Sequence, residues 1–297
     1  MSIDSTTVSS FPLCISDASL TSSSQNINNN TNTSKPKHLI YNELMNQAQD
    51  ILSYIITKFH EIDAPIILMY GTMLYEYRNS TPGDACLHIN GNDKDFDIAV
   101  FPKHWEYIAD YLSVEIQSKF GWKWWTDARA RPRLFGTIYY PGQGIPKNKI
   151  HMIDVYGFQC NSTSDVIKFP WDVVTIARDS FLPVQRHKTI PLPRGEENNS
   201  NNTHTTSEIA NDTPAYYMPY NPHCLLTNIY GYDYMTPKSG PTSQAKYGGE
   251  HGRPAYGNPQ CNSTLSMLEQ DELERQLKFC DSSEGGGIPE GTLDISS

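Results

Sequence analysis

The chain has 297 residues, enough to bury a substantial core in one large domain or in one domain with appendages. Its formal net charge of -10 argues against a protein that binds nucleic acid non-specifically, because such a protein needs a basic surface to meet the phosphates. The charge does not exclude a small anionic substrate, since a metal ion and a few local Arg or Lys residues can reverse the field inside a cleft.

The two ends of the chain are polar and are expected to be disordered. Residues 1–37 are dominated by Ser, Thr and Asn, and they cannot bury enough apolar surface to offset their conformational entropy. Residues 241–297 are rich in Gly, Ser and other polar residues and predict a mostly flexible tail with one short helix. Residues 38–240 are therefore expected to form the folded domain, with a polar insertion at 195–214.

The folded part opens with a pattern typical of an α/β unit. Apolar residues recur at three- and four-residue steps from His38 to Phe59, which predicts one apolar face of a helix. The short apolar run Ile66 to Tyr70 has the length of a buried strand, and Gly71 and Thr72 follow it. A further helical turn or two is expected from Met73 to Arg78, so helix, strand and helix alternate.

A second α/β unit follows a predicted loop over residues 79–92. Phe96 to Phe101 reads as a strand, entered directly from an acidic cluster. Pro102 stands where a helix can begin, apolar residues continue at helical spacing to Phe120, and Gly121 suits the helix end. The succession predicts another strand and helix of the same layered domain.

Three more strands are expected before the chain becomes irregular. They are Trp122 to Trp125, Leu134 to Tyr140 and Lys149 to Phe158, and the last two form a hairpin around a Pro-Gly-Gln-Gly turn. Beyond Trp171 the sequence predicts irregular structure until Thr189. The fold class is thus α/β (α+β): a mixed sheet flanked by helices, with disordered polar termini.

Two helices complete the expected elements. Cys224 to Tyr230 reads as a short helix, and Ser266 to Phe279 reads as an amphipathic one. Ser266 with Glu269 three residues later has the spacing of a capping box, in which each side chain bonds the other residue's backbone N–H.

The cysteine pattern favours a reducing compartment. None of the six Cys forms a Cys-x-x-Cys pair, so free thiols are expected, no common zinc module fits, and a few disulfides are the alternative if the protein is secreted. No stretch approaches the roughly 18 apolar residues of a membrane span, and no export signal is recognisable. The default localisation is cytoplasmic, and sequons such as those at Asn79 and Asn161 are expected by chance.

The acidic cluster before the second strand carries the strongest chemical signal. Side chains two residues apart on a strand point to the same side, so Asp95 and Asp97 converge while Phe96 turns to the opposite face. Two hard carboxylates in this arrangement suit Mg²⁺ or Mn²⁺, which can bridge nucleotide phosphates. An isolated Asp-x-Asp is also common in solvated acidic turns, so its neighbours decide its meaning.

Two other features of the sequence favour a functional carboxylate pair over a solvated acidic turn. Asp154 lies on a separate predicted strand, where a charge is costly unless it is paired or bound to metal. The turn after the first strand offers backbone N–H groups and the Thr72 hydroxyl to phosphate oxygens. A Gly-Thr turn, a strand-borne Asp-x-Asp and a later strand Asp follow the order of the nucleotidyltransferase fold.

At this point the chain resembles the LicD/fukutin-like family. The pieces that match the family's motifs are Met69-Tyr70-Gly71-Thr72-Met73-Leu74, Arg78, Asp93 to Asp97, Ile153-Asp154-Val155, Ile190-Pro191-Leu192-Pro193 and the ending from Leu225 to Pro237. Their order along about residues 38–240 makes the resemblance more specific than any single piece. The resemblance implies a metal-dependent phosphotransferase that moves phosphocholine or a sugar-alcohol phosphate from a CDP-activated donor to a glycan or glycolipid.

The resemblance also implies roles for single residues. Asp95 and Asp97 would hold the metal, and Asp154 would be a third ligand or the base that accepts the acceptor hydroxyl's proton. Gly71 and Thr72 would contact the donor phosphate, and Arg78 would counter its charge. It further implies that the secretory-pathway lumen is an alternative to the cytoplasm.

Lys94, Tyr75 and Glu76 depart from the family pattern, and so does the longer loop 79–92. Two alternatives therefore stay open. One is a non-catalytic relative that binds nucleotide or glycan and regulates glycan phosphorylation. The other is a nucleotidyltransferase that acts on another substrate.

Overall fold

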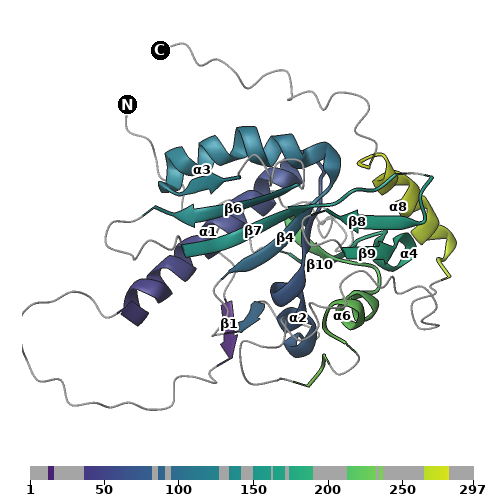
Figure 1. The fold of residues 1–297 in the computed structure, drawn as a ribbon, viewed down its shortest axis with the longest axis horizontal. Coiled ribbons are helices and arrows are strands. Elements are labelled where there is room, and N and C mark those ends of the chain that lie inside the picture. The colour runs from purple at the N-terminus through teal and green to yellow at the C-terminus, as the bar shows by residue number, and fades with distance from the viewer. Residues whose placement is uncertain are drawn as a thin grey trace, which may run out of the picture.

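The architecture was analysed in a computed structural model of the chain. It describes residues 13–16, 37–81, 86–90, 95–126, 134–141, 150–161, 163–170, 174–189, 213–231, 234–236 and 264–280. The fold is α/β: a mixed sheet of seven strands with helices packed around it, as expected from the sequence (Figure 1). None of the helices in these ranges has the length and apolarity of a membrane span.

The large sheet contains the five predicted strands. Its strands, in spatial order, are β10 (Gln185–Thr189), β11 (Ala215–Met218), β2 (Ile66–Leu68), β4 (Phe96–Val100), β7 (Ile150–Gly157), β6 (Phe135–Tyr140) and β5 (Lys123–Trp125). The predicted strands form β2, β4, β5, β6 and β7. The pairs β11–β2 and β4–β7 are parallel and the other four pairs are antiparallel. The expected hairpin between β6 and β7 is confirmed.

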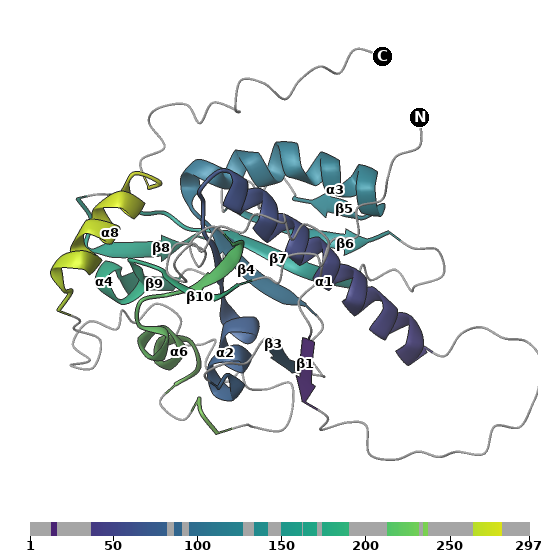
Figure 2. The same ribbon diagram turned by 180° about the vertical axis from the view of Figure 1, so that it is seen from behind.

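Helix α1 (Lys37–Glu61) covers one face of this sheet, in front of it in Figure 2. The apolar residues that recur along it are almost fully buried, among them Ile51, Ile55 and Phe59. The helix ends where Asp63 adopts a left-handed conformation (φ 52°), which Asp tolerates better than most residues. The N–H of Ala64 then donates to the Phe59 carbonyl, 2.9 Å away, and the chain turns into β2.

The predicted helix after Pro102 is built in three parts. It begins with a 3₁₀ turn, η1 (Pro102–His104), continues through a π turn, η2 (Tyr107–Leu112), and ends as α3 (Ser113–Phe120). Gly121 closes it with φ 72°, the left-handed conformation that glycine adopts without strain. Its buried face, including Trp105, Ile108 and Leu112, extends the apolar core.

Two segments expected to be unstructured contain strands. Leu13–Ser16 forms β1 and pairs in parallel with β3 (Leu87–Asn90), so the predictions of disorder over 1–37 and of loop over 79–92 are wrong at these places. A parallel partner more than 70 residues away leaves no trace in local composition, which was the basis of the prediction. The rest of residues 1–36 lies outside the described ranges, as does almost all of the predicted insertion 195–214.

The stretch beyond Trp171 is also more regular than expected. A small hairpin of β8 (Val166–Phe169) and β9 (Val174–Ala177) leads into α4 (Arg178–Phe181) and then β10. Its order comes from tertiary packing, because the rings of Phe158, Phe169 and Phe181 contact one another with centroids 5.1 to 5.7 Å apart. Such tertiary contacts can order a segment whose local sequence pattern predicts irregular structure.

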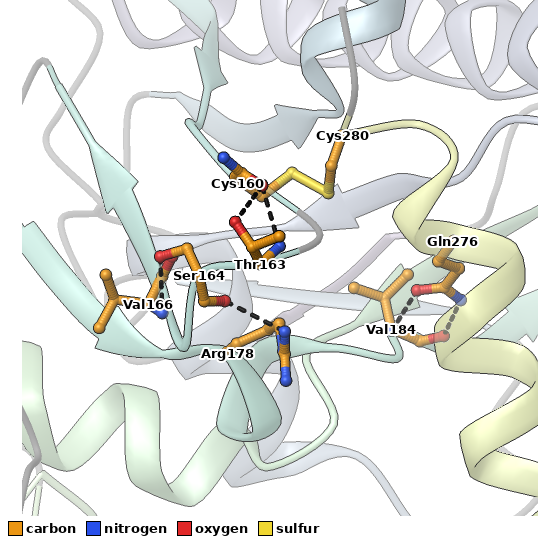
Figure 3. The surroundings of a disulfide bond; sticks show 9 residues. Cys160, Thr163, Ser164, Val166, Arg178, Val184, Gln276 and Cys280 are labelled. Atoms are coloured by element: carbon orange, nitrogen blue, oxygen red, sulfur yellow. Dashed lines mark hydrogen bonds between the residues drawn. A yellow bond between two sulfur atoms is a disulfide. The ribbon is translucent and has the colours of Figure 1, made fainter.

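The helix predicted near the C-terminus belongs to the folded body. Helix α8 (Met267–Leu277) begins with the expected capping box of Ser266 and Glu269. Its Gln276 is fully buried and bonds both backbone groups of Val184, with distances of 2.7 and 3.0 Å (Figure 3). Residues 264–280 are therefore docked on the domain, which extends beyond the expected boundary at residue 240.

The prediction of free thiols is wrong. Cys160 and Cys280 form a disulfide that fastens the end of α8 to the segment after β7 (Figure 3). Cys86 and Cys224 are disulfide-bonded as well. No cysteine of the described ranges is a free thiol. The two linked cysteines stand 120 residues apart, so their spacing carried no sign of the bond. Disulfides persist in oxidising compartments, which removes the argument for a reducing one.

His104 gives the fold a pH dependence. Burial against Phe59 and Phe279, with the nearby Lys103 charge, lowers the pKa of His104 from 6.5 to about 4. The unfolded chain therefore binds the proton more readily, so stability is lost as pH falls from 6.5 through 4, by about 3 kcal/mol in total. We expect urea unfolding to show this loss in the wild-type protein and a flatter profile in His104→Phe. An equal slope in both proteins between pH 6.5 and 4 would assign the loss to other groups.

Candidate functional site

The centre of the candidate site is the turn between β2 and α2 (Tyr70–Asn79). Tyr70 has φ 42°, an uncommon conformation for a bulky residue, and its ring packs edge-on against Tyr156 with centroids 4.7 Å apart. Strain of this kind persists where surrounding contacts enforce it, and it is concentrated at functional sites. The turn brings the first N–H groups of α2 to the side chains of β4.

The carboxylate of Asp97 is fixed by this turn. The N–H of Gly71 donates to Asp97 Oδ2 at 3.0 Å, and the N–H of Asp97 donates to the Thr72 hydroxyl at 2.8 Å. Asp97 is only 9% exposed, and a hydroxyl of Tyr156 lies 3.4 Å from its Oδ1 atom. The structure thus places Gly71 and Thr72 beside the Asp97 carboxylate, while their contact with a donor phosphate stays a prediction.

Asp97 and Asp154 are brought together by strand register. They are direct partners in the parallel pair of β4 and β7, so their side chains leave the same face of the sheet at adjacent positions. Thr137 of β6 is the next partner in the same row and is fully buried. Two carboxylates at such positions repel each other and concentrate negative charge where a cation would be favoured.

Asp95, the third predicted metal ligand, is not part of a strand. Asp95 lies before the first residue of β4 and is partly buried. Among the residues that the structure describes, no three His, Cys, Asp or Glu side chains form a ready metal cluster. The chemistry of the donor set nevertheless fits Mg²⁺ or Mn²⁺, because Mg²⁺ is usually held by one or two carboxylates together with water and substrate phosphates. The roles of Asp95, Asp97 and Asp154 as ligands stay predictions.

Arg78 lies on the same face of α2 as Gly71, because seven residues make nearly two turns, about 10 Å along the axis. Its Nε atom is buried, and no described group accepts a hydrogen bond from it. Burial lowers the pKa of the guanidinium, while the hydroxyls of Tyr75, Tyr230 and Tyr234 oppose that shift. A buried donor of this kind calls for an acceptor, and an anionic group would supply one.

The wall beside Arg78 comes from α6 (Pro222–Tyr230) and the residues that follow it. In both views α6 lies beside α2 (Figures 1 and 2). The helix confirms the short helix predicted there. Asn221 caps its start by accepting from the N–H of Cys224, and Gly231 ends it with φ 87°. After it, Tyr234 packs against Tyr77 and lies 2.7 Å from His223 Nδ1.

Glu76 ties α2 to the outer strands of the sheet. It is fully buried and accepts from Lys188 Nζ at 2.6 Å, from the N–H of His88 at 2.7 Å and from the hydroxyl of Tyr216 at 3.2 Å. Its Oε1 atom also lies 2.9 Å from His187 Nε2. Burial alone would raise the pKa of Glu76, but these hydrogen bonds lower it to about 2, so the group stays ionised. Its role is to hold α2 in position.

Sequence reasoning missed Tyr156, which contacts both Asp97 and the strained Tyr70. A signal was present, because Tyr156 follows Asp154 by two residues and so shares its face of β7. It also missed Lys188 as the partner of Glu76, for which the sequence held no signal.

Comparison with known proteins adds no constraint to this site. No protein-family model matches the chain, and no curated protein matches it either.

Proposed function

We propose that the chain is a metal-dependent phosphotransferase that moves a phosphate-linked group from a CDP-activated donor to a glycan or glycolipid. The observation that carries the proposal is the direct pairing of Asp97 and Asp154 on parallel strands beside the first N–H groups of α2. The ordered resemblance to LicD/fukutin-like proteins supports the same class of reaction. The disulfides support a lumenal or extracellular setting, where glycans are modified.

Each residue has a distinct part in this proposal. Asp97 and Asp154, with Asp95 beside them, would hold Mg²⁺ or Mn²⁺, which would neutralise charge on the donor phosphates. Gly71 and Tyr156 keep the Asp97 carboxylate oriented by hydrogen bonds. Arg78 would receive a phosphate oxygen on its unsatisfied Nε–H.

One carboxylate of the pair, Asp154, has a further candidate role as a base. Asp154 is more accessible than Asp97, since it is only partly buried. A carboxylate placed between metal and acceptor can accept the proton of the attacking hydroxyl, which raises the nucleophilicity of its oxygen. Asp154 is therefore our candidate for the general base, as the alternative to its role as a metal ligand.

The test is a screen for CMP release from CDP-choline, CDP-ribitol and CDP-glycerol with Mn²⁺, with and without candidate glycans. We expect one donor to release CMP only when the metal is present, and Asp154→Asn to abolish that release. Thermal unfolding with Mn²⁺ and CDP, ATP or UTP gives an independent readout. A shift with ATP or UTP alone would favour a nucleotidyltransferase on another substrate, and no metal-dependent shift with any nucleotide would overturn both enzymatic functions.

A further inference from the structure

The segment after β7 contains an acceptor sequence for N-linked glycosylation. Asn161, Ser162 and Thr163 match Asn-x-Ser/Thr with a middle residue other than Pro. Asn161 is exposed and follows directly on Cys160, whose disulfide to Cys280 is drawn in Figure 3. A bulky, solvated group at this side chain is thus compatible with the folded domain.

Local hydrogen bonds fix the Asn161 side chain by its oxygen. The backbone N–H and the hydroxyl of Thr163 both donate to Asn161 Oδ1, each at 2.9 Å. Figure 3 shows Thr163 beside the disulfide. Within the described ranges, no hydrogen bond engages the Nδ2 atom of Asn161, which is the atom that glycosylation modifies.

The disulfides change how this sequence is interpreted. Because no export signal is recognisable, the sequence alone predicts that this acceptor sequence occurs by chance in a chain rich in Asn, Ser and Thr. The Cys160–Cys280 bond, together with the bonded Cys86 and Cys224, indicates an oxidising compartment. Oligosaccharides are transferred to asparagine in the same secretory compartment where disulfides form.

Asn161 is also made well before Cys280, the partner of the neighbouring Cys160. Cys280 follows Cys160 by 120 residues, so their bond cannot close until those further residues have been made. During that interval Asn161 lies on a chain segment that is not yet cross-linked to the C-terminal helix. A transferase can therefore reach it before the fold is complete.

We propose that Asn161 carries an N-linked oligosaccharide. In the transfer, Asn161 Nδ2 forms a bond to C1 of the first sugar and loses one proton. The bond between C1 and a phosphate oxygen of a lipid-pyrophosphate-linked oligosaccharide breaks, and the lipid pyrophosphate leaves with the electron pair. The modification goes beyond the proposed phosphotransferase activity and does not depend on it.

The test is a peptide map of the full chain, purified without reduction from the cells that produce it. After digestion with peptide N-glycosidase in ¹⁸O-labelled water, we expect position 161 to appear as ¹⁸O-labelled Asp. Asn46, which is exposed but outside any acceptor sequence, is the control for spontaneous deamidation and should stay unlabelled. An unmodified Asn161 would overturn the proposal, whether Cys160 and Cys280 are found bonded or reduced.

Two matched variants separate the glycan from the fold. Asn161→Asp keeps the Oδ1 acceptor for Thr163 but removes the amide nitrogen, so the protein should lose the mass of one glycan. Thr163→Val removes the required hydroxyl and should have the same effect, whereas Thr163→Ser keeps the acceptor sequence and the glycan. An unchanged mass in Asn161→Asp would also overturn the assignment.

Discussion

Replacing Asp97 with Asn is expected to lower metal-dependent CMP release on the order of 10³-fold while leaving the fold in place. The change removes one of the two paired negative charges, so the remaining carboxylate of Asp154 holds a divalent cation poorly. The Asn oxygen can still accept from the N–H of Gly71, and the bond from the Asp97 backbone to Thr72 does not change. The measurement is kcat/KM at saturating Mn²⁺, with the free energy of unfolding from urea titration.

Asn is a better substitution than Ala at this position. Ala would leave the partly buried N–H of Gly71 without its acceptor, at a cost of about 1–3 kcal/mol, and would mix a stability effect with the catalytic one. Asp110→Asn makes the same chemical change on the exposed surface of η2 and is expected to keep full activity. Wild-type activity in Asp97→Asn would remove Asp97 from the proposed metal site. If that variant fails to fold, Asp154→Asn provides the same test.

The elements with strong local periodicity could be predicted from the sequence. Helix α1 and strands β4 and β7 have apolar patterns that tertiary contacts reinforce. Asp97 and Asp154 could each be placed on a strand, and their residue types indicated hard cations. Their mutual position could not be predicted, because a strand pattern fixes the face of each side chain and leaves the register between strands open.

Long-range partners account for what could not be predicted. Glu76 departs from the small residue of the resembled family, and in the sequence it had no evident purpose. In the structure its charge is stabilised by Lys188, 112 residues later along the chain, and by the backbone of His88. Burying such a charge without those partners would cost several kcal/mol. The reason for a carboxylate at position 76 is therefore clear only once the fold places Lys188 beside it.

Removing the Cys160–Cys280 disulfide with the double variant Cys160→Ala/Cys280→Ala is expected to lower the free energy of unfolding by about 5 kcal/mol. The chain-entropy relation gives this magnitude for a closed loop of 120 residues, because the cross-link restricts the unfolded chain more as the loop lengthens. Ala is chosen because Cys280 is buried, where a Ser hydroxyl would add its own penalty. The measurement is urea unfolding without reductant, so that the disulfides of Cys86 and Cys224 persist.

Comparison with Gln276 separates the cross-link from the packing of α8. Gln276→Leu breaks both hydrogen bonds to Val184 but keeps the disulfide, and we expect it to cost about 1–3 kcal/mol. If the double Cys variant loses less than Gln276→Leu, the contacts of α8 hold the C-terminal segment without the bond. If it loses more, the restriction of the unfolded chain dominates, and the covalent link of residues 160 and 280 is what makes the C-terminal helix part of the domain.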